Sequence, residues 1–310
     1  MKRARRVVRV TAHAKLNLGL AVGPRRSDGY HEIATVFQSI SLADTLTLRR
    51  RRGGLRLVVR MENAARRGRA GRETIPTGAG NLVVRAARLF QERFAAPGGV
   101  DLRLTKRIPA GTGLGGASAD AAATLVGLSR LHGLGLSARR LQEVAAELGS
   151  DVPFAVSGGT ALGLGRGERI RRLRLRRAFH GVVAVPAWRV STALAYRRID
   201  QGKYGLTLWK AKLRSAQALG RDGVTTLEAR RLGNTFENAL GQRRSSFVSL
   251  CSRLRAAGFE CPRLTGSGSA VFALSKDDDV VKAAIRRFEG RERLYAVRSA
   301  RTGARAVVAS

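Results

Sequence analysis

A short stretch of the chain combines residue types that could bind phosphate. Between a segment expected to be a strand and one expected to be a helix lie four glycines and a serine: Gly111, Gly113, Gly115, Gly116 and Ser118. Without Cβ atoms, consecutive backbone N–H groups of such a loop can converge on an anion, and the following helix adds its positive N-terminal end. The pattern therefore predicts a cradle for the phosphates of a nucleotide.

The same loop matches the G-x-G-x-x-G pattern of dinucleotide-binding folds and protein kinases. The preceding segment, Val100 to Ile108, alternates apolar and polar residues, which favours a half-exposed antiparallel strand over the buried parallel strand of a dinucleotide fold. No Lys-Ser or Lys-Thr pair follows Gly116, and the His-Arg-Asp and Asp-Phe-Gly signatures of protein kinases are absent. For the loop alone, a structural strand-to-helix turn is the alternative interpretation.

The chain is strongly basic. Its 310 residues include 58 lysines and arginines against 22 acidic residues, a formal net charge of +36. Such a field attracts nucleic acid, anionic membranes and phosphorylated substrates alike. The excess is dispersed along the chain, however, and aromatic residues make up only 5%, too few for a base-stacking platform. We expect no specific nucleic-acid partner, but salt-sensitive, non-specific association with polyanions.

Composition also bears on location. Hydrophobic residues make up 44% of the chain, yet no apolar run approaches the roughly 18 residues of a membrane span, so no membrane partner is expected. The segment Met1 to Arg6 is basic, but Val7 to Val10 is too short for the apolar core of a signal peptide. Cys251 and Cys261 do not form a metal-binding pair. We expect a cytoplasmic enzyme that is a monomer or a weak homodimer.

Elements that would position the loop can be read from periodicity. The alternating segment Val8 to Val22 predicts a strand with Lys15 and Asn17 on its polar side. Further strands are expected over 33–40, 45–48, 181–186 and 293–297, and a second glycine turn that leads into a strand is expected over 264–274. Helices are expected over 81–94, 121–131, 137–148, 227–240, 245–257 and 280–288, with an irregular basic stretch over 62–80. The mixture of hairpins and helices indicates an α+β fold. A basic run, Arg166 to Arg177, separates the two halves, so we place a domain boundary between 1–165 and 166–310.

Three separated segments, taken together, resemble the motifs of the galactokinase, homoserine kinase, mevalonate kinase and phosphomevalonate kinase (GHMP) superfamily. In chain order they are Ala14 to Leu18, Pro109 to Ala123 and Leu264 to Phe272. Three more segments resemble the branch of that superfamily that phosphorylates 4-diphosphocytidyl-2-C-methyl-D-erythritol in the non-mevalonate isoprenoid pathway: Asp28 to His31, Leu148 to Phe154 and Val190 to Tyr196. The match covers nearly the whole chain.

The resemblance implies both fold and reaction. It implies a two-domain GHMP kinase fold, with a ribosomal-protein-like N-terminal domain that binds ATP and a ferredoxin-like C-terminal domain that binds substrate. The reaction implied is transfer of the γ-phosphoryl group of ATP, with Mg²⁺ expected alongside it, to the 2-hydroxyl of the cytidyl-diphospho substrate.

Individual roles follow from the same resemblance. Asp151 matches the catalytic base, which would accept the proton of the attacking hydroxyl, and Lys15 matches the catalytic lysine, which would keep Asp151 ionised. Residues implied to bind ATP are Pro109, Gly111, Gly113, Leu114, Gly115, Gly116, Ser118 and Asn81. Residues implied to bind the substrate are Asn17, Tyr30, His31, Tyr196, Gly266 and Gly268. Tyr30 and Tyr196 would sandwich the cytosine ring, and His31 would bind its edge.

Simpler roles compete with some of these. Ser118 and Asn81 could instead cap helices, and the glycines of the third motif could only shape a turn. The chain also has Ala117-Ser118-Ala119 where many relatives have Gly-Ser-Ser, so one hydroxyl is missing and the metal ligands stay unassigned. A homoserine or mevalonate type of kinase and a basic nucleic-acid-binding protein are the alternative functions.

Overall fold

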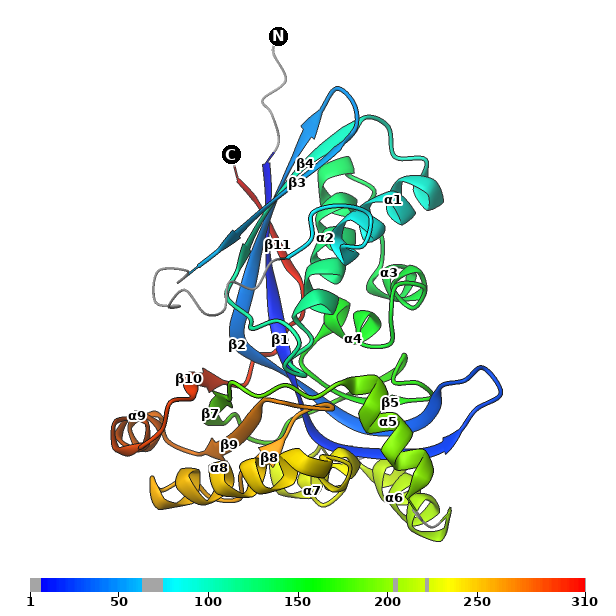
Figure 1. Ribbon diagram of the computed structural model, residues 1–310. Coiled ribbons are helices and arrows are strands. Elements are labelled where there is room, and N and C mark those ends of the chain that lie inside the picture. Colours follow the sequence, from blue (N-terminus) through cyan, green and yellow to red (C-terminus); the bar gives the residue numbers. More distant parts are fainter. Residues whose placement is uncertain (1–6, 63–74, 203–205, 221–222, 310) are drawn as a thin grey trace.

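The computed structural model describes residues 7–62, 75–202, 206–220 and 223–309 (Figure 1). The basic start, Met1 to Arg6, and most of the irregular stretch over 62–80 lie outside the described residues. Within the described chain, strands form two sheets, one in the upper part of Figure 1 and one in the lower part.

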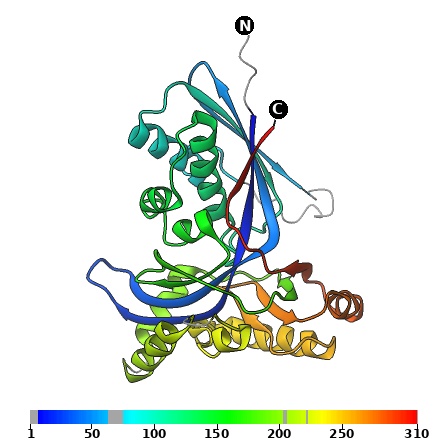
Figure 2. The same cartoon turned by 180° about the vertical axis from the view of Figure 1, so that it is seen from behind.

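The larger sheet has the strand order β11-β1-β2-β4-β3, and β5 pairs with β2 and β6 with β5. Its strands are β1 (Val7–Arg25), β2 (His31–Arg51), β3 (Leu55–Met61), β4 (Gly99–Lys106), β5 (Thr160–Leu164), β6 (Arg169–Leu173) and β11 (Arg305–Ala309). One face carries alternate apolar side chains that are fully buried, such as Val8, Leu46 and Leu102. Helices α1 (Leu82–Phe94), α2 (Gly116–His132) and α4 (Val152–Ser157) cover that face, and α3 (Ala138–Ala145) packs outside them against α4 and α2 (Figures 1 and 2).

Helix α2 fits closely against β1 and β2 because its buried residues include many small ones, such as Ala121, Ala122 and Gly127. A Cβ atom at Gly127 would lie 2.5 Å from Leu48 Cδ1, so only glycine allows this approach. The close fit fixes the N-terminus of α2, and with it the glycine-rich loop, relative to β1.

The smaller sheet has the order β10-β7-β9-β8, from β7 (His180–Val185), β8 (Arg263–Leu264), β9 (Val271–Ser275) and β10 (Arg293–Arg298). Around it lie α5 (Thr192–Gln201), α6 (Leu206–Ala218), α7 (Thr226–Arg230), η2 (Thr235–Asn238), η3 (Gly241–Arg243), α8 (Arg244–Ala256) and α9 (Asp278–Arg287). A second apolar cluster packs here, and Leu20 and Val22 of β1 belong to it. The strand β1 therefore runs through both parts of the molecule (Figure 1).

Several expectations from periodicity need correction. The expected helix over 227–240 is wrong: α7 ends at Arg230, and Gly233, with φ +67°, separates it from η2. The two short strands expected over 33–40 and 45–48 are one strand, β2, of 21 residues. The prediction that β1 has one polar side is also wrong. Register shifts between His13 and Lys15 and between Asn17 and Gly19 interrupt the alternation, and the side chains of Lys15 and Asn17 are both buried.

The boundary placed at residue 165 stays a prediction. Two strands that follow it in sequence, β6 and β11, pair within the larger sheet rather than the smaller one. Of the helices in the described part of the chain, none combines the length and the hydrophobicity that a membrane span requires.

Candidate active site

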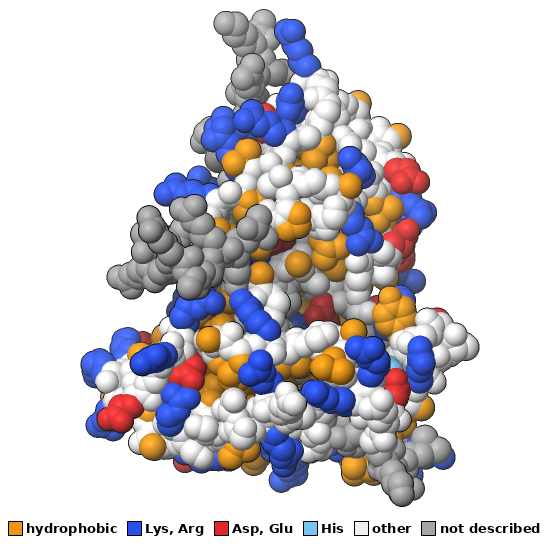
Figure 3. All heavy atoms as spheres, viewed as in Figure 1, with side chains coloured by type: hydrophobic (Ala, Val, Ile, Leu, Met, Phe, Trp, Pro, Cys, Tyr) orange, Lys and Arg blue, Asp and Glu red, His pale blue; other side chains and the backbone are white. Residues whose placement is uncertain are grey.

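A cavity of about 520 Å³ lies where the two parts of the molecule meet. Figure 3 shows a hollow at this level of the surface. The lining comes from the glycine-rich loop, from β1, from α5 and from the loop that joins β8 to β9. Of the residues predicted for the site, all line the cavity except Tyr30 and His31.

Two glycine loops pack directly on each other beside the cavity. A Cβ atom at Gly113, with φ +82°, would lie 2.3 Å from the carbonyl oxygen of Thr265. The backbone of Ala270 donates a hydrogen bond of 3.0 Å to the carbonyl of Thr112. The first loop thus needs glycine both for its left-handed backbone and for its contact with the second.

The glycine loop leads into α2 without a side-chain cap. The N-cap residue is Gly115, which forms no side-chain hydrogen bond, and Ser118 lies inside the first turn. The capping role considered for Ser118 is therefore wrong, and its side chain lines the cavity. Free N–H groups at this helix end suit an anionic ligand.

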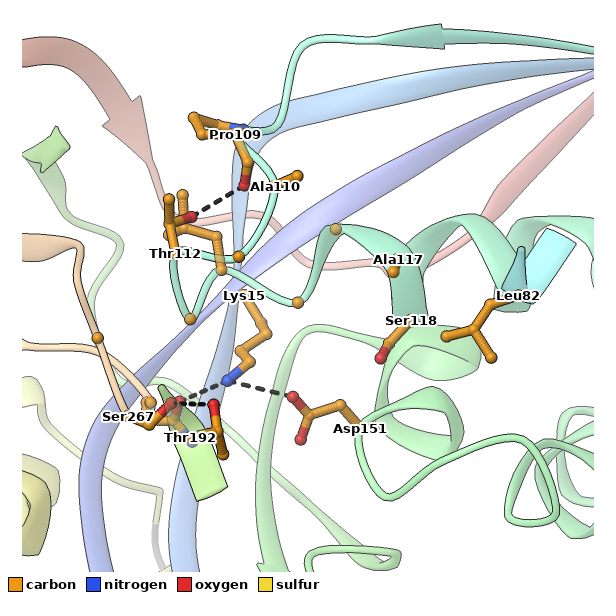
Figure 4. A pocket seen from close by; sticks show the side chains of 18 of the residues that line it. Lys15, Leu82, Pro109, Ala110, Thr112, Ala117, Ser118, Asp151, Thr192 and Ser267 are labelled. Atoms are coloured by element: carbon orange, nitrogen blue, oxygen red, sulfur yellow. Dashed lines mark hydrogen bonds and ion pairs between the residues drawn. The ribbon is translucent and has the colours of Figure 1, made fainter. Parts of the chain in front are cut away.

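Lys15 occupies the space between the two loops. Its ammonium nitrogen donates a hydrogen bond of 2.6 Å to Asn17 Oδ1 and lies 3.3 Å from Asp151 Oδ2 (Figure 4). Its backbone N–H donates to the carbonyl of Leu114, 3.0 Å away. The lysine side chain is 8% exposed and the aspartate side chain 33%, so the ion pair faces the cavity from one side.

Asp151 reaches this position because it precedes a short helix. It stands at the N-cap of α4, with Pro153 in the first turn, but its side chain makes no capping hydrogen bond. The carboxylate is therefore directed to Lys15 instead of the helix. Asn17 is fixed as well, since its backbone N–H donates to Thr265 Oγ1 at 3.0 Å and its amide donates to Thr35 Oγ1 at 2.8 Å.

Tyr196 closes one end of the cavity. Its ring stacks on His31, with centroids 4.8 Å apart, and meets Phe236 edge-on at 5.0 Å. Burial, and then the charge of Asp151, raise the pKa of the Tyr196 hydroxyl, which stays protonated at neutral pH. His31 Nε2 lies 2.7 Å from Asp200 Oδ1.

Tyr30 lies apart from this cluster. Its side chain is exposed, at 53%, and its ring lies under the guanidinium of Arg166, 4.8 Å from the ring centre. Among the described residues, the ring contacts of Tyr196 are with His31 and Phe236 and not with Tyr30. A base held between the two tyrosines therefore stays a prediction.

Asn81 has the capping role that was one of its two interpretations. Its side-chain oxygen accepts a hydrogen bond of 2.8 Å from Val83 N at the start of α1, and its amide donates to Pro76 at 2.6 Å. Asn81 and Pro76 both line the cavity, so the cap also shapes its wall.

A buried ionic cluster that the sequence analysis missed lies under the glycine loop. Lys106, at the end of β4, forms ion pairs with Asp44 and, at 2.6 Å, with Asp120 Oδ2. Asp44 also accepts a hydrogen bond of 2.9 Å from Ile108 N, next to the loop. Asp120 Oδ1 is buried and has no hydrogen-bond partner, although Asp120 and Lys106 both line the cavity.

In this cluster, burial and the charge of the ion-pair partner shift the pKa of Lys106, and likewise that of Asp120, in opposite directions. Burial raises the pKa of Asp120 well above its usual range, against the charge of Lys106. Burial lowers the pKa of Lys106, but the charges of Asp120 and Asp44 outweigh it and leave that pKa raised. The sequence signal for the cluster is an acidic residue within an otherwise apolar helix, which needs a buried partner.

Known proteins resemble the chain over most of its length. The profile described as the GHMP kinases N terminal domain matches residues 81–159. A protein of Moorella thermoacetica is 41% identical over 89% of this chain and 93% of its own length, and one of Solibacter usitatus is 40% identical over 88% and 83%. Both are named 4-diphosphocytidyl-2-C-methyl-D-erythritol kinase.

Solved structures agree with this. A crystal structure of 4-(cytidine 5'-diphospho)-2C-methyl-D-erythritol kinase superposes with a TM-score of 0.70 at 34% identity, covering 94% of this chain and 98% of the other. Homoserine kinase from Cytophaga hutchinsonii also superposes with a TM-score of 0.70, at 19% identity and over 99% of each chain, which shows a common fold.

Proposed function

The chain belongs to the 4-diphosphocytidyl-2-C-methyl-D-erythritol kinase family of the GHMP kinases, and on that basis we propose that it phosphorylates the 2-hydroxyl of this substrate with ATP. It is an ATP-dependent small-molecule kinase of the isoprenoid pathway. The observation that carries the proposed chemistry is the 3.3 Å contact between Lys15 Nζ and Asp151 Oδ2 beside the glycine loop.

Asp151 is the general base. It accepts the proton of the substrate hydroxyl as that oxygen bonds to the γ-phosphorus, while the bond from the γ-phosphorus to the bridging oxygen breaks and ADP leaves. Its partial exposure towards the cavity supports this role, because the hydroxyl must reach the carboxylate.

Lys15 stabilises the charge around the transferred group. An ammonium group has three N–H donors, and contacts with Asn17 and Asp151 leave one for a phosphoryl oxygen. Its ammonium group also holds the Asp151 carboxylate in place beside the cavity. Asn17, held by Thr265 and Thr35, orients the substrate.

The glycine loop and the start of α2 hold the phosphates of ATP through backbone N–H groups. Asn81 and Pro109, which line the cavity, would contact adenine, and Tyr196, which stacks on His31, would hold the cytosine together with His31 and Tyr30. The N-terminal part, 1–165, would thus carry ATP, and the substrate would lie against the C-terminal part, 166–310, with Tyr30 and His31 of the N-terminal part completing its cytidyl site.

Mg²⁺ is expected with ATP, and the residues present fit it. The described residues include no cluster of three or more His, Cys, Asp or Glu side chains able to hold a metal ion. Mg²⁺, however, usually takes one or two carboxylates together with substrate phosphates and waters. Asp120 Oδ1, buried without a partner, and Ser118 would provide protein oxygens in the cavity. When bound, Mg²⁺ would neutralise negative charge on the phosphates.

The surroundings of the enzyme are also part of the proposal. Cys251 and Cys261 are free thiols, which suits the reducing cytoplasm. The enzyme would be a monomer or a weak homodimer.

A substrate panel tests the proposal. We expect ADP release from ATP with 4-diphosphocytidyl-2-C-methyl-D-erythritol, and turnover of homoserine or mevalonate at least about 10³-fold slower, because their binding lacks the cytidyl contacts. Phosphorylation of homoserine or mevalonate without turnover of the cytidyl compound would overturn the substrate assignment but not the kinase family.

A further inference from the structure

The face of the larger sheet that the helices do not cover carries a regular array of basic side chains. Cross-strand pairing aligns three rows across β11, β1, β2, β4 and β3. The rows are Arg305-Thr11-Thr45-Thr105-Arg60, then Val307-Arg9-Thr47-Arg103-Val58, then Val7-Arg49-Asp101-Arg56. We call this array the arginine face.

The arginine face is accessible and largely of one sign. The side chains of Arg9, Arg49, Arg56, Arg60, Arg103 and Arg305 are all exposed. The array has one acidic residue, Asp101, and its carboxylate is already opposed by Arg51 at 3.4 Å. Within the described part of the chain, Arg9, Arg56 and Arg103 make no ion pair. Their guanidinium groups are therefore free to bind an external anion.

The helical side of the molecule differs in charge pattern. Figure 3 shows acidic and basic side chains next to each other over that side. Arg93 pairs with Glu147 at 2.8 Å, and Arg140 pairs with Glu143 at 2.9 Å. The arginine face therefore differs from the general excess of arginine in that its rows contain six arginines against one acidic residue, Asp101, which is already paired with Arg51.

Another basic segment has a different explanation. Strand β6, with Arg169, Arg171 and Arg172, pairs only with β5 and is an edge of the sheet. Arg171 there donates to the carbonyls of Gln217 and Leu219. Charged edge strands prevent strand addition by other chains, so these arginines need no ligand.

The arginine face is also hollowed. A depression of about 420 Å³ is lined by Arg56, Arg60 and Arg103 with the hydroxyl residues Thr47 and Thr105, and its one acidic lining residue is Asp101. Arginine and threonine side chains are common donors to phosphate oxygens. None of these residues lines the cavity proposed for ATP, so the two sites are separate.

We propose that the arginine face binds single-stranded nucleic acid through its phosphate backbone, independently of base sequence. The five aligned strands span four spacings of about 4.8 Å, or about 19 Å, which is wider than the major groove of about 12 Å, so the sheet does not enter a duplex groove. The array contains no aromatic residue, so bases do not stack on it and binding comes from phosphate contacts. This surface is independent of the proposed kinase reaction.

The test compares two triple variants of the full chain. In the first variant, Arg9, Arg56 and Arg103 are replaced by glutamine. In the matched control, glutamine replaces three exposed arginines on helices, Arg85, Arg88 and Arg287, so each variant loses three positive charges. Binding of a fluorescein-labelled oligouridylate is measured by anisotropy over a range of salt concentrations. Each phosphate contact to a single strand makes the plot of log affinity against log salt steeper by about 0.7. The plot for the first variant should therefore be less steep than that of the wild type by about 2, and the plot for the control should keep the wild-type slope.

We expect both variants to keep the kinase activity of the wild type, which would show that they are folded. Equal loss of affinity and slope in the two variants would mean that net charge alone attracts the RNA, and would overturn the proposal. It would equally be overturned if the wild type bound phosphatidylglycerol vesicles or a duplex of the same length more tightly than the oligouridylate.

Discussion

Gly115 lies so close to Lys15 that a Cβ atom at the glycine would come within 2.9 Å of Lys15 Cγ. The glycine at the N-cap of α2 thus also sets the position of the lysine side chain. This contact relates the phosphate loop to the ion pair of Lys15 and Asp151, because a change in the loop must move the ammonium group.

The first prediction uses that contact. Gly115→Ala should lower kcat by about 10- to 100-fold, since displacement of a positioned group by a fraction of an ångström is costly in catalysis. Gly135→Ala is the matched control: Gly135 also has a left-handed backbone, with φ +58°, but a Cβ atom added there would meet no other atom within 4 Å. Both variants should lose about 1–2 kcal/mol of unfolding free energy from backbone strain, measured in urea, and equal kcat values for the two would contradict the prediction.

The second prediction concerns Tyr196. Tyr196→Leu removes the aromatic contacts with His31 and Phe236 at the end of the cavity, so the KM for the cytidyl substrate should rise by about 3- to 10-fold. The KM for ATP should stay the same. Tyr295→Leu, on β10 and away from the cavity, serves as control. A rise in both KM values in steady-state assays would show that Tyr196 supports the whole cavity and not the cytidyl end.

The third prediction is a pH dependence of stability. Because burial raises the pKa of Asp120, the folded protein holds that proton more tightly than the unfolded chain. The protonated Asp120 carboxyl contributes its full stability below the pKa of aspartate in the unfolded chain, about 3.9. This contribution is lost as the pH rises through the pKa of Asp120 in the folded protein. Asp120→Asn does not titrate, so its free energy of unfolding relative to the wild type should increase with pH, by up to about 1.4 kcal/mol per unit.

Urea unfolding of the wild type and Asp120→Asn at several values between pH 5 and pH 8 measures this difference. Asp279→Asn, where the side chain is 89% exposed, is the control and should give a curve parallel to the wild type. A parallel curve for Asp120→Asn as well would show that the buried carboxyl stays ionised across this range.

The sequence predicted the local features of the site better than its long-range ones. Glycine spacing alone indicated the phosphate loop, because backbone freedom is a local property, and the alternation around Lys15 indicated a strand. The meeting of Lys15 with Asp151 depends on residues far apart in the chain, and it came only from the resemblance to a family.

Other long-range features were not predictable in this way. The partners of Lys106 lie on β2 and α2, and no local pattern specifies that they meet. Likewise, β11 returns to pair with β1 at the far end of the chain. His31 was expected to bind the edge of the cytosine ring. In the structure its Nε2 atom lies beside Asp200, whose position is set by the packing of α5.

The most direct test of the catalytic account is the kcat of Asp151→Asn with 4-diphosphocytidyl-2-C-methyl-D-erythritol and saturating ATP. Asparagine keeps the size of the side chain but cannot accept the hydroxyl proton, so kcat should fall by about 10²- to 10⁴-fold while both KM values stay within about threefold. Asp279→Asn, on the surface of α9, should keep the wild-type rate. A kcat for Asp151→Asn within about twofold of the wild type would contradict the assignment of Asp151 as the base.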